Sequence, residues 1–358
     1  MNNENMLLQL FAKTIEQNAS DLHLLAGVPP VLRVDGDLQK ISQTPLTSQE
    51  ITTAILSILT ENQKDVFLQN KSLDFSYGFG GSDYGDKGRF RINIFFQRGT
   101  AALAARLLPP KVKTIDELGL PQVVHKFPQL TQGFVLVTGP TGHGKSTTLA
   151  SIINEIHMAK GVNILTIEDP IEYMYPPGKS IISQRELGLD TLSWREALKS
   201  ALREDPDVVL VGEMRDPESM ASAMTIAETG HLVFSTLHTN SASQTIDRVI
   251  DAFPEHQQNQ IRVQLAATLA GVISQRLIPK IEGGRTVATE IMLGTQAVKS
   301  TIRDGKTHLL DSIIETSKED GMILLEHSLA ELVKNGTISL EIAHSYAQRP
   351  GALTRLVR

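Results

Sequence analysis

Apolar and polar residues alternate in several short segments of the first hundred positions. Residues 21–24, 31–34 and 89–96 change side at every position, which is the period of a half-buried β-strand. Asp35-Gly36 follows the second segment, and a further alternating run comes directly after it, so the pattern predicts a β-hairpin with a tight turn. Residues 101–108 are predicted to form the last strand of this region.

Helical spacing occurs in two other segments of the same region. Apolar residues recur every three or four positions in 6–15 and again in 47–69, so each segment is expected to bury one face. Strands and helices mixed in this way predict a small α+β domain over residues 1–110. Pro109-Pro110 stops regular structure, and the polar stretch after it is expected to be an interdomain linker at 111–120.

Residues 121–358 show a different pattern, in which apolar strands alternate with amphipathic helices. This order is typical of an α/β fold with a mainly parallel sheet. The part beyond residue 255 is expected to be mostly helical. The predicted strands are 134–137, 164–167, 208–211 and 232–237.

A phosphate-binding motif lies between the first of these strands and the helix that follows. Gly139, four further residues and Gly144-Lys145-Ser146 match the Walker A pattern, in which glycines let backbone N–H groups surround phosphates. A chance glycine-rich turn is the alternative, but the flanking strand and helix argue against it. Lys145 is expected to reach the β- and γ-phosphates of ATP, and Ser146 to bind Mg²⁺. The residues expected to bind the nucleotide are Gly139, Pro140, Thr141, Gly142, His143, Gly144, Lys145, Ser146 and Thr147.

His143 is an unusual residue within this loop. We interpret it as a passive substitution whose ring points to solvent, because the backbone of the loop supplies the phosphate contacts. The alternative is that the imidazole itself touches a phosphate.

Two carboxylates follow buried strands. Glu213 comes after the strand 208–211, and an acid at such a strand tip holds Mg²⁺ or the attacking water in other P-loop enzymes. Gly212 stands where an Asp is usual. Glu168 also ends a strand and could polarise the attacking water, because open α/β sheets bind ligands at the carboxyl ends of their strands. The alternatives are a surface acid at each position and an ordinary turn at Asp169-Pro170.

His231 and His238 flank the strand 232–237. The two side chains fall on opposite sides of a regular strand, so one metal ion cannot easily bind both. We interpret His238, at the carboxyl end, as a sensor of the γ-phosphate, and His231, at the start, as a connection to another element. Two structural histidines are the alternative.

Composition narrows the class of protein further. The 358 residues include no cysteine, which excludes disulfides, thiolate zinc sites and cysteine nucleophiles. A formal net charge of −6 gives no general attraction to nucleic acid, so no direct nucleic-acid partner is expected. No apolar run reaches the length of a membrane span, and the first residues lack the pattern of a signal peptide. A cytoplasmic protein is therefore expected.

Four motifs in this order resemble those of the secretion-type ATPases of the RecA-like class, and most closely those of its pilus-retraction members. They are the Walker A loop, ILTIEDPIEY, DVVLVGEMRD and TGHLVFSTLHT, and the similarity also includes SDLHLLAGVPPVLRVDGDL and RFRINIFFQ near the N-terminus. The resemblance implies a PAS-like N-terminal domain, a RecA-like ATPase domain and a homohexameric ring. It also implies Glu168 and Glu213 as catalytic acids, and His231 and His238 as residues of the His box.

Such rings bind the nucleotide between domains or subunits, and arginines of a neighbouring element complete the site. Arg89 and Arg91 share one strand face, and Arg106 lies on the next strand, so all three are candidates. A solvated basic edge is the alternative.

The resemblance implies a Mg²⁺-dependent ATP hydrolase that drives type IV pilus retraction and twitching motility at the inner face of the cytoplasmic membrane. Its expected partners are an inner-membrane platform protein and a paralogous retraction ATPase. The rivals are a pilus-extension or type II secretion assembly motor, a conjugation-type DNA-transfer ATPase and a ring that binds ATP without useful turnover. Assembly motors usually carry an extra N-terminal domain and a four-cysteine zinc element, so the cysteine-free chain favours retraction. In this family one stretch near the C-terminus is associated with retraction. Residues 297–304 match that stretch only in part.

Overall fold

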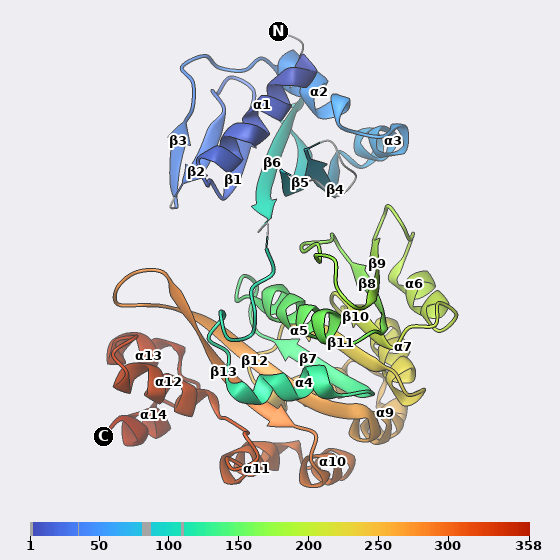
Figure 1. Cartoon of the computed structure of the whole chain (residues 1–358), viewed down its shortest axis with the longest axis vertical. Helices are drawn as coiled ribbons and strands as arrows, with labels where there is room; N and C mark the ends of the chain where they lie inside the picture. Colours follow the sequence, from blue (N-terminus) through green and yellow to red (C-terminus); the bar gives the residue numbers. More distant parts are fainter. Residues whose placement is uncertain (1–2, 35, 81–86, 109–110) are drawn as a thin grey trace. The chain divides into compact units, whose positions relative to one another are not determined.

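The computed structural model describes residues 3–34, 36–80, 87–108 and 111–358 (Figure 1). The chain divides into two compact units, of which the first comprises Met1–Lys111 with Asp169–Met174 and the second comprises the remainder. Across the described ranges, no helix combines the length and the apolar character that a membrane span requires.

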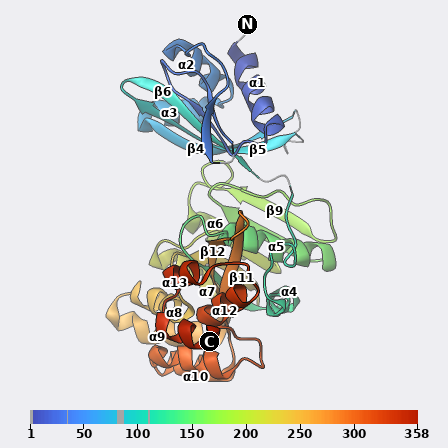
Figure 2. The ribbon, with the colours of Figure 1, turned by 90° about the vertical axis from the view of Figure 1, so that its left-hand side faces the viewer.

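The first unit is built on a six-stranded antiparallel sheet with the order β3-β2-β1-β6-β5-β4. The helices α1 and α2 pack on this sheet (Figures 1 and 2), and apolar residues of α1, α2, β1 and β5 form one core. The strands are β1 (Asp21–Leu24), β2 (Val31–Val34), β3 (Asp37–Lys40), β4 (Ser72–Phe79), β5 (Gly88–Gln97) and β6 (Thr100–Leu108). The helices are α1 (Asn3–Glu16), α2 (Ser48–Ser57) and α3 (Glu61–Asn70).

Most predicted elements of this unit are confirmed, including the hairpin of β2 and β3, although Asp35 of its turn lies outside the described residues. The helical character expected over 47–69 is confirmed, although the segment forms two helices, α2 and α3. Thr60 accepts a hydrogen bond from the backbone N–H of Gln63, and the Gln63 side chain accepts one from the backbone N–H of Thr60. This capping box starts a second helix inside the segment. The strand β4 was not predicted.

The second unit contains a seven-stranded sheet with the order β13-β12-β7-β11-β10-β8-β9, in which only β13 is antiparallel to its neighbour. The strands are β7 (Gly133–Thr138), β8 (Asn163–Glu168), β9 (Ile181–Glu186), β10 (Val208–Val211), β11 (Leu232–Leu237), β12 (Leu269–Pro279) and β13 (Arg285–Leu293). Residues 112–120, expected as a linker, lie within this unit, and Ile115 and Leu120 are buried in its core.

Helices cover both faces of this sheet (Figure 1). Alternate residues of β7 point to opposite sides, so Val135 packs with residues of α5, whereas Phe134 packs with residues of α7, α8 and α9. The helices are α4 (Lys126–Gln129), α5 (Lys145–Ala159), α6 (Trp194–Ala201), α7 (Pro217–Glu228), α8 (Ala242–Asp251), α9 (Glu255–Thr268), α10 (Gln296–Arg303), α11 (Leu310–Thr316), α12 (Leu325–Lys334), α13 (Leu340–Tyr346) and α14 (Pro350–Val357), with short 3₁₀ segments at Gln122–His125 and Thr307–Leu309.

The chain beyond residue 255 is mostly helical, as expected, but the expectation missed β12 and β13, which form a long antiparallel pair there. Leu269, Val272 and Ile273 fall three and four positions apart, which imitates the period of a helix. All three are buried in the strand β12, which carries helices on both faces and therefore lacks the alternation of a half-buried strand. Three helices, α12, α13 and α14, gather beside β12 and β13 near the C-terminus (Figures 1 and 2) and form a small separate core with Ile278.

Candidate active site

The predicted phosphate-binding loop lies between β7 and α5, as the motif requires. Gly142 and Gly144 have φ values of 80° and 83°, in the left-handed region that favours glycine. A Cβ atom at Gly139 would lie 2.5 Å from the carbonyl oxygen of Gln275, so β12 passes too close for any side chain there. The glycines therefore shape a loop that precedes a helix N-terminus, which is the arrangement that binds phosphate.

Lys145 is buried at the base of this loop, with 8% of its surface exposed. Its ammonium group donates to the carbonyl oxygens of Gly139 at 2.9 Å and Pro140 at 3.1 Å. It also lies 3.3 Å from Nδ1 of His238. Because an ammonium group can only donate, Nδ1 of His238 accepts this hydrogen bond, and the proton of the neutral ring is on Nε2.

The protonated Nε2 of His238 faces a carboxylate oxygen of Glu213 at 3.3 Å. Glu213 also forms an ion pair with Arg215. Partial burial by itself raises the pKa of Glu213, but hydrogen bonds from Arg215 and His238 outweigh it and hold the pKa below its ordinary value. Glu213 is therefore ionised at neutral pH. The ring of His238 connects this carboxylate to Lys145, so three of the predicted site residues meet at the carboxyl edge of the sheet.

Glu168 ends β8, the strand on the far side of β10 from β11. Its Oε1 accepts hydrogen bonds from the Thr166 hydroxyl at 2.7 Å and from the Gln184 side chain at 3.2 Å. The side chain is thus held by residues of β8 and β9 at the same edge of the sheet.

His231 lies at the opposite end of β11 from His238. Its Nδ1 lies 3.0 Å from the carbonyl oxygen of Ile226 in α7 and 3.0 Å from the Thr229 hydroxyl. The structure therefore connects His231 to another element, as we expected from its position, and does not bring it to the phosphate-binding loop of the same chain.

The three candidate arginines belong to the first unit. Arg91 of β5 pairs directly with Arg106 of β6, and Arg89 lies on the same face of β5. Like charges opposite each other destabilise a sheet unless anions compensate them. Arg106 donates to Asp21 at 2.9 Å, Arg91 lies 3.6 Å from Glu172 of the same unit, and Arg89 donates to the Ser76 hydroxyl.

His143 does not point to solvent, which corrects our interpretation of it as a passive residue. Its Nδ1 accepts a hydrogen bond of 3.0 Å from the backbone N–H of Leu277 in β12. The Gln275 side chain donates to the His143 carbonyl oxygen at 2.7 Å. The tip of the loop is thus tied to β12 through both the ring and the backbone of one residue.

Comparison with known proteins identifies the family. The sequence profile described as "Type II/IV secretion system protein" matches residues 3–340. The chain belongs to this family. It is 47% identical to the "Type IV pilus retractation ATPase PilT" of Pseudomonas aeruginosa, over 96% of this chain and 98% of that protein. It is 35% identical to the "Type IV pilus ATPase PilU" of the same organism, over 98% of this chain and 91% of that protein.

A solved structure resembles the whole chain as well. The crystal structure of the pilus retraction motor PilT with bound ADP superposes with a TM-score of 0.89 and 44% sequence identity, and the match covers 97% of this chain and 98% of that one. The full-length match to this secretion ATPase is consistent with a P-loop ATPase fold. It also agrees with the pilus-retraction branch that the motifs indicated.

Sequence reasoning missed three contributors to the site. Arg215 follows Glu213 by two positions, and this spacing is a local signal that could have pointed to it. Gln275 and Leu277 carry no comparable signal, because the segment containing them was expected to be helical. Their contacts with the loop follow only from the position of β12 beside β7.

We predict that His143→Ser weakens ATP binding about fivefold near pH 8, because one hydrogen bond contributes about 1 kcal/mol. Burial lowers the pKa of His143, and the nearby Arg276, Lys145 and Arg285 lower it further. Since the folded-state pKa lies below the ordinary value, the stabilisation is present above the unfolded pKa of about 6.5 and is lost as pH falls through the folded pKa. ATP titrations across this range should show the two proteins converging in acid.

The exposed His256 offers a matched control, and His256→Ser should bind ATP as the parent does at every pH. Equal affinities of His143→Ser and the parent at pH 8 would show that the ring does not organise the loop.

Proposed function

We propose that this chain is a P-loop ATPase whose turnover drives the retraction of type IV pili. The observation that carries the ATPase part is the convergence of Lys145 and Glu213 on the ring of His238, which joins three separate motifs at one edge of the sheet. The retraction part rests on the similarity to PilT over nearly the full length of both chains. The lower identity to PilU favours the PilT-like role.

The residues present fit a nucleotide triphosphate with Mg²⁺. The glycine-rich loop leads into the N-terminus of α5, where backbone N–H groups favour a phosphate, and Ser146 is exposed in the first turn of that helix. The described residues contain no group of three or more His, Cys, Asp or Glu side chains that could hold a metal ion, so Ser146 and the phosphates are the expected ligands, with Glu213 beside them. Bound MgATP would supply the phosphoryl group that is transferred to water.

The side chains then have distinct roles. Lys145 donates to phosphate oxygens in place of the loop carbonyls that it now contacts. Glu213 is ionised and orients the attacking water or a metal-bound one, and Glu168 is a second acid for the same task. His238 transmits the position of Lys145 to Glu213, which is how the γ-phosphate could be sensed.

Further features of the proposal concern assembly. We assign the first unit as a PAS-like module and the second as a RecA-like domain. In a homohexameric ring, one or more of Arg89, Arg91 and Arg106 complete the nucleotide site, and His231 contacts a neighbouring element. The motor works in the cytoplasm against an inner-membrane platform protein, and a PilU-like paralogue is a candidate partner.

Deletion of the gene tests the direction of the motor. Cells without the protein should carry excess pili that do not retract, and the wild-type gene should restore retraction while a gene encoding Lys145→Ala should not. Loss of surface pili in the deletion strain would contradict retraction and identify an extension motor. Normal pili together with a defect in protein secretion would identify a secretion motor.

A further inference from the structure

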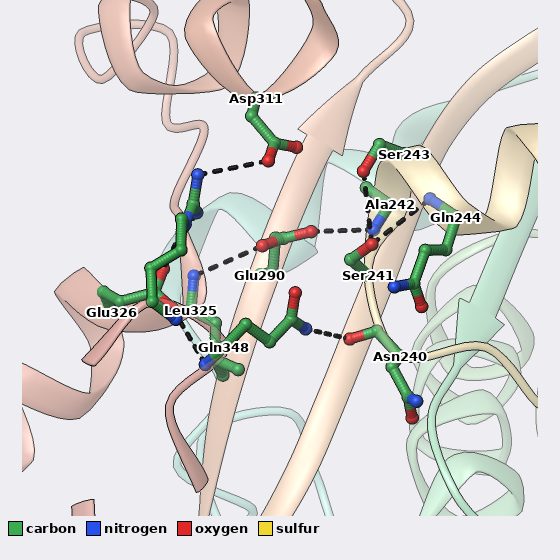
Figure 3. Close-up of polar contacts among 11 residues, drawn as sticks. Asn240, Ser241, Ala242, Ser243, Gln244, Glu290, Asp311, Leu325, Glu326 and Gln348 are labelled. Carbon is green, nitrogen blue, oxygen red and sulfur yellow. Dashed lines mark hydrogen bonds and ion pairs between the residues drawn. The ribbon is translucent and has the colours of Figure 1, made fainter. Parts of the chain in front are cut away.

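A buried carboxylate lies at the meeting point of two helices outside the residues discussed so far. Glu290 of β13 has 1% of its surface exposed. One carboxylate oxygen accepts a hydrogen bond from the backbone N–H of Ala242 at 2.7 Å, and the other accepts one from the backbone N–H of Leu325 at 3.5 Å (Figure 3). Ala242 is the first residue of α8, and Leu325 is the first residue of α12.

The N-termini of α8 and α12 therefore share one buried acceptor. The first N–H groups of a helix have no partner within it, and the positive end of the helix dipole favours an anion. The cap residue of α12, Leu324, has no side chain that could accept such a hydrogen bond. Glu290 supplies this acceptor from a different element, so it fixes α12 and α8 relative to β13.

A second contact joins the same segments. The Gln348 side chain donates to the carbonyl oxygen of Asn240 (Figure 3). Gln348 and Arg349 donate their backbone N–H groups to Glu326 of α12 at 3.1 Å and 2.8 Å. The Arg349 guanidinium also bonds Glu326 at 2.8 Å, so residue 348 is held firmly against α12.

Asn240 lies two residues after His238, whose ring contacts both Lys145 and Glu213. The segment 238–242 thus runs from the candidate active site directly into the contacts with Glu290 and Gln348. We name Glu290, the N–H groups of Ala242 and Leu325, and the Gln348–Asn240 contact the Glu290 junction.

We propose that Glu290 is a positioning residue for ATP turnover: its ionised carboxylate holds the segment 238–242, and with it the ring of His238, in register with the C-terminal helices. The proposal rests on the proposed ATPase function. Movement of α12 and α14 would reach His238 through this junction.

The ionisation of Glu290 is poised near neutrality. Burial raises the pKa of Glu290 to about 7, and Asp311 of α11 adds to this rise, whereas the two backbone N–H groups and Arg349 oppose it. Arg276 of β12 also faces this carboxylate. The ionised form accepts from both N–H groups more strongly, because protonation makes one oxygen an O–H donor and a weaker acceptor. The junction is therefore complete above about pH 7 and weakens below it.

The test compares Glu290→Gln with the parent. The amide has the same shape but turns an NH₂ group toward one of the two helix N–H groups. We expect kcat to fall roughly tenfold with KM for ATP within about twofold, because a hydrogen bond to a charged group is lost while the phosphate loop is intact. The kcat of the parent should fall as pH drops through about 7, whereas Glu290→Gln should lack this step. The exposed Glu282→Gln is the matched control and should follow the parent.

Hydrogen–deuterium exchange of the peptide 236–246, without nucleotide, gives a readout that is independent of catalysis. Exchange should be faster in Glu290→Gln and in Gln348→Ala. The second variant removes the exposed contact with Asn240, and it tests the proposal if Glu290→Gln does not fold. Unchanged exchange and kcat in the folded variants would overturn the proposal. If the parent shows no ATPase activity, the proposed function fails, while faster exchange in the variants still supports the junction.

Discussion

Glu213→Gln is expected to bind ATP nearly as well as the parent and to hydrolyse it roughly 10²–10⁴-fold more slowly. The amide preserves the shape of the side chain and can still accept from Nε2 of His238, so the loop around Lys145 should keep its geometry. It removes the negative charge that Arg215 and His238 stabilise, and with it the ability to orient water or a metal ion.

Binding and turnover must be measured separately for this prediction. A fluorescent ATP analogue reports affinity, and phosphate release under single-turnover conditions reports chemistry. Glu218→Gln is a suitable control, because Glu218 is an acid at the start of α7 that pairs with Arg195 outside the site. Lys145→Ala should instead lose ATP binding. Hydrolysis at the parental rate by Glu213→Gln would show that Glu213 has no part in catalysis. Hydrolysis by Lys145→Ala would show that the loop is not the ATP-binding site.

Rings that contain both an arginine variant and Glu213→Gln subunits should recover ATPase activity that rings of either variant alone lack. An arginine that stabilises the transition state in other P-loop enzymes changes the rate roughly 10³–10⁵-fold, so loss of such a residue among Arg89, Arg91 and Arg106 should abolish measurable turnover. If that arginine acts on a neighbouring subunit, a Glu213→Gln subunit can donate it to a site whose own Glu213 is intact. Combining the two inactive proteins should then restore part of the ATPase activity.

The experiment needs proof that rings are mixed, for example by co-purification through two different affinity tags. Arg98→Asn serves as the control, because Arg98 is exposed in the turn after β5 and Asn tolerates its φ of 49°. An inactive arginine variant that gains nothing in confirmed mixed rings would show that its role lies within its own chain.

The strands with clear boundaries were predictable from the sequence, and the site residues that end them were predictable too. Glu213 and His238 follow short apolar runs, so their placement at one sheet edge follows from parallel pairing of β10 and β11. The helical spacing over 47–69 did not show where one helix ends and the next begins, because the capping box at Thr60 lies within the apolar period. The strand β12 was missed altogether, because burial on both faces removes the alternation by which strands are recognised.

The residues that contact the candidate site from other elements were harder to predict than the site residues themselves. Nothing in the local sequence places Glu290 against Ala242, because the two are 48 positions apart and meet only when β13 pairs with the misassigned β12. The arginines were also only partly predictable. The shared face of Arg89 and Arg91 follows from alternation along β5, but the pairing of Arg91 with Arg106 depends on the register between β5 and β6.

The hydrogen bond between His143 and Leu277 has a consequence for how related sequences diverge. Its acceptor is a side chain, but its donor is a main-chain N–H, which every amino acid except proline provides. Any residue except proline at position 277 can donate this hydrogen bond, although the Leu277 side chain itself packs against the core. The acceptor, in contrast, depends on the histidine at position 143. Because the donor is a main-chain group, this contact would produce no paired substitutions in an alignment. The histidine would look like an isolated change until its position beside β12 is known.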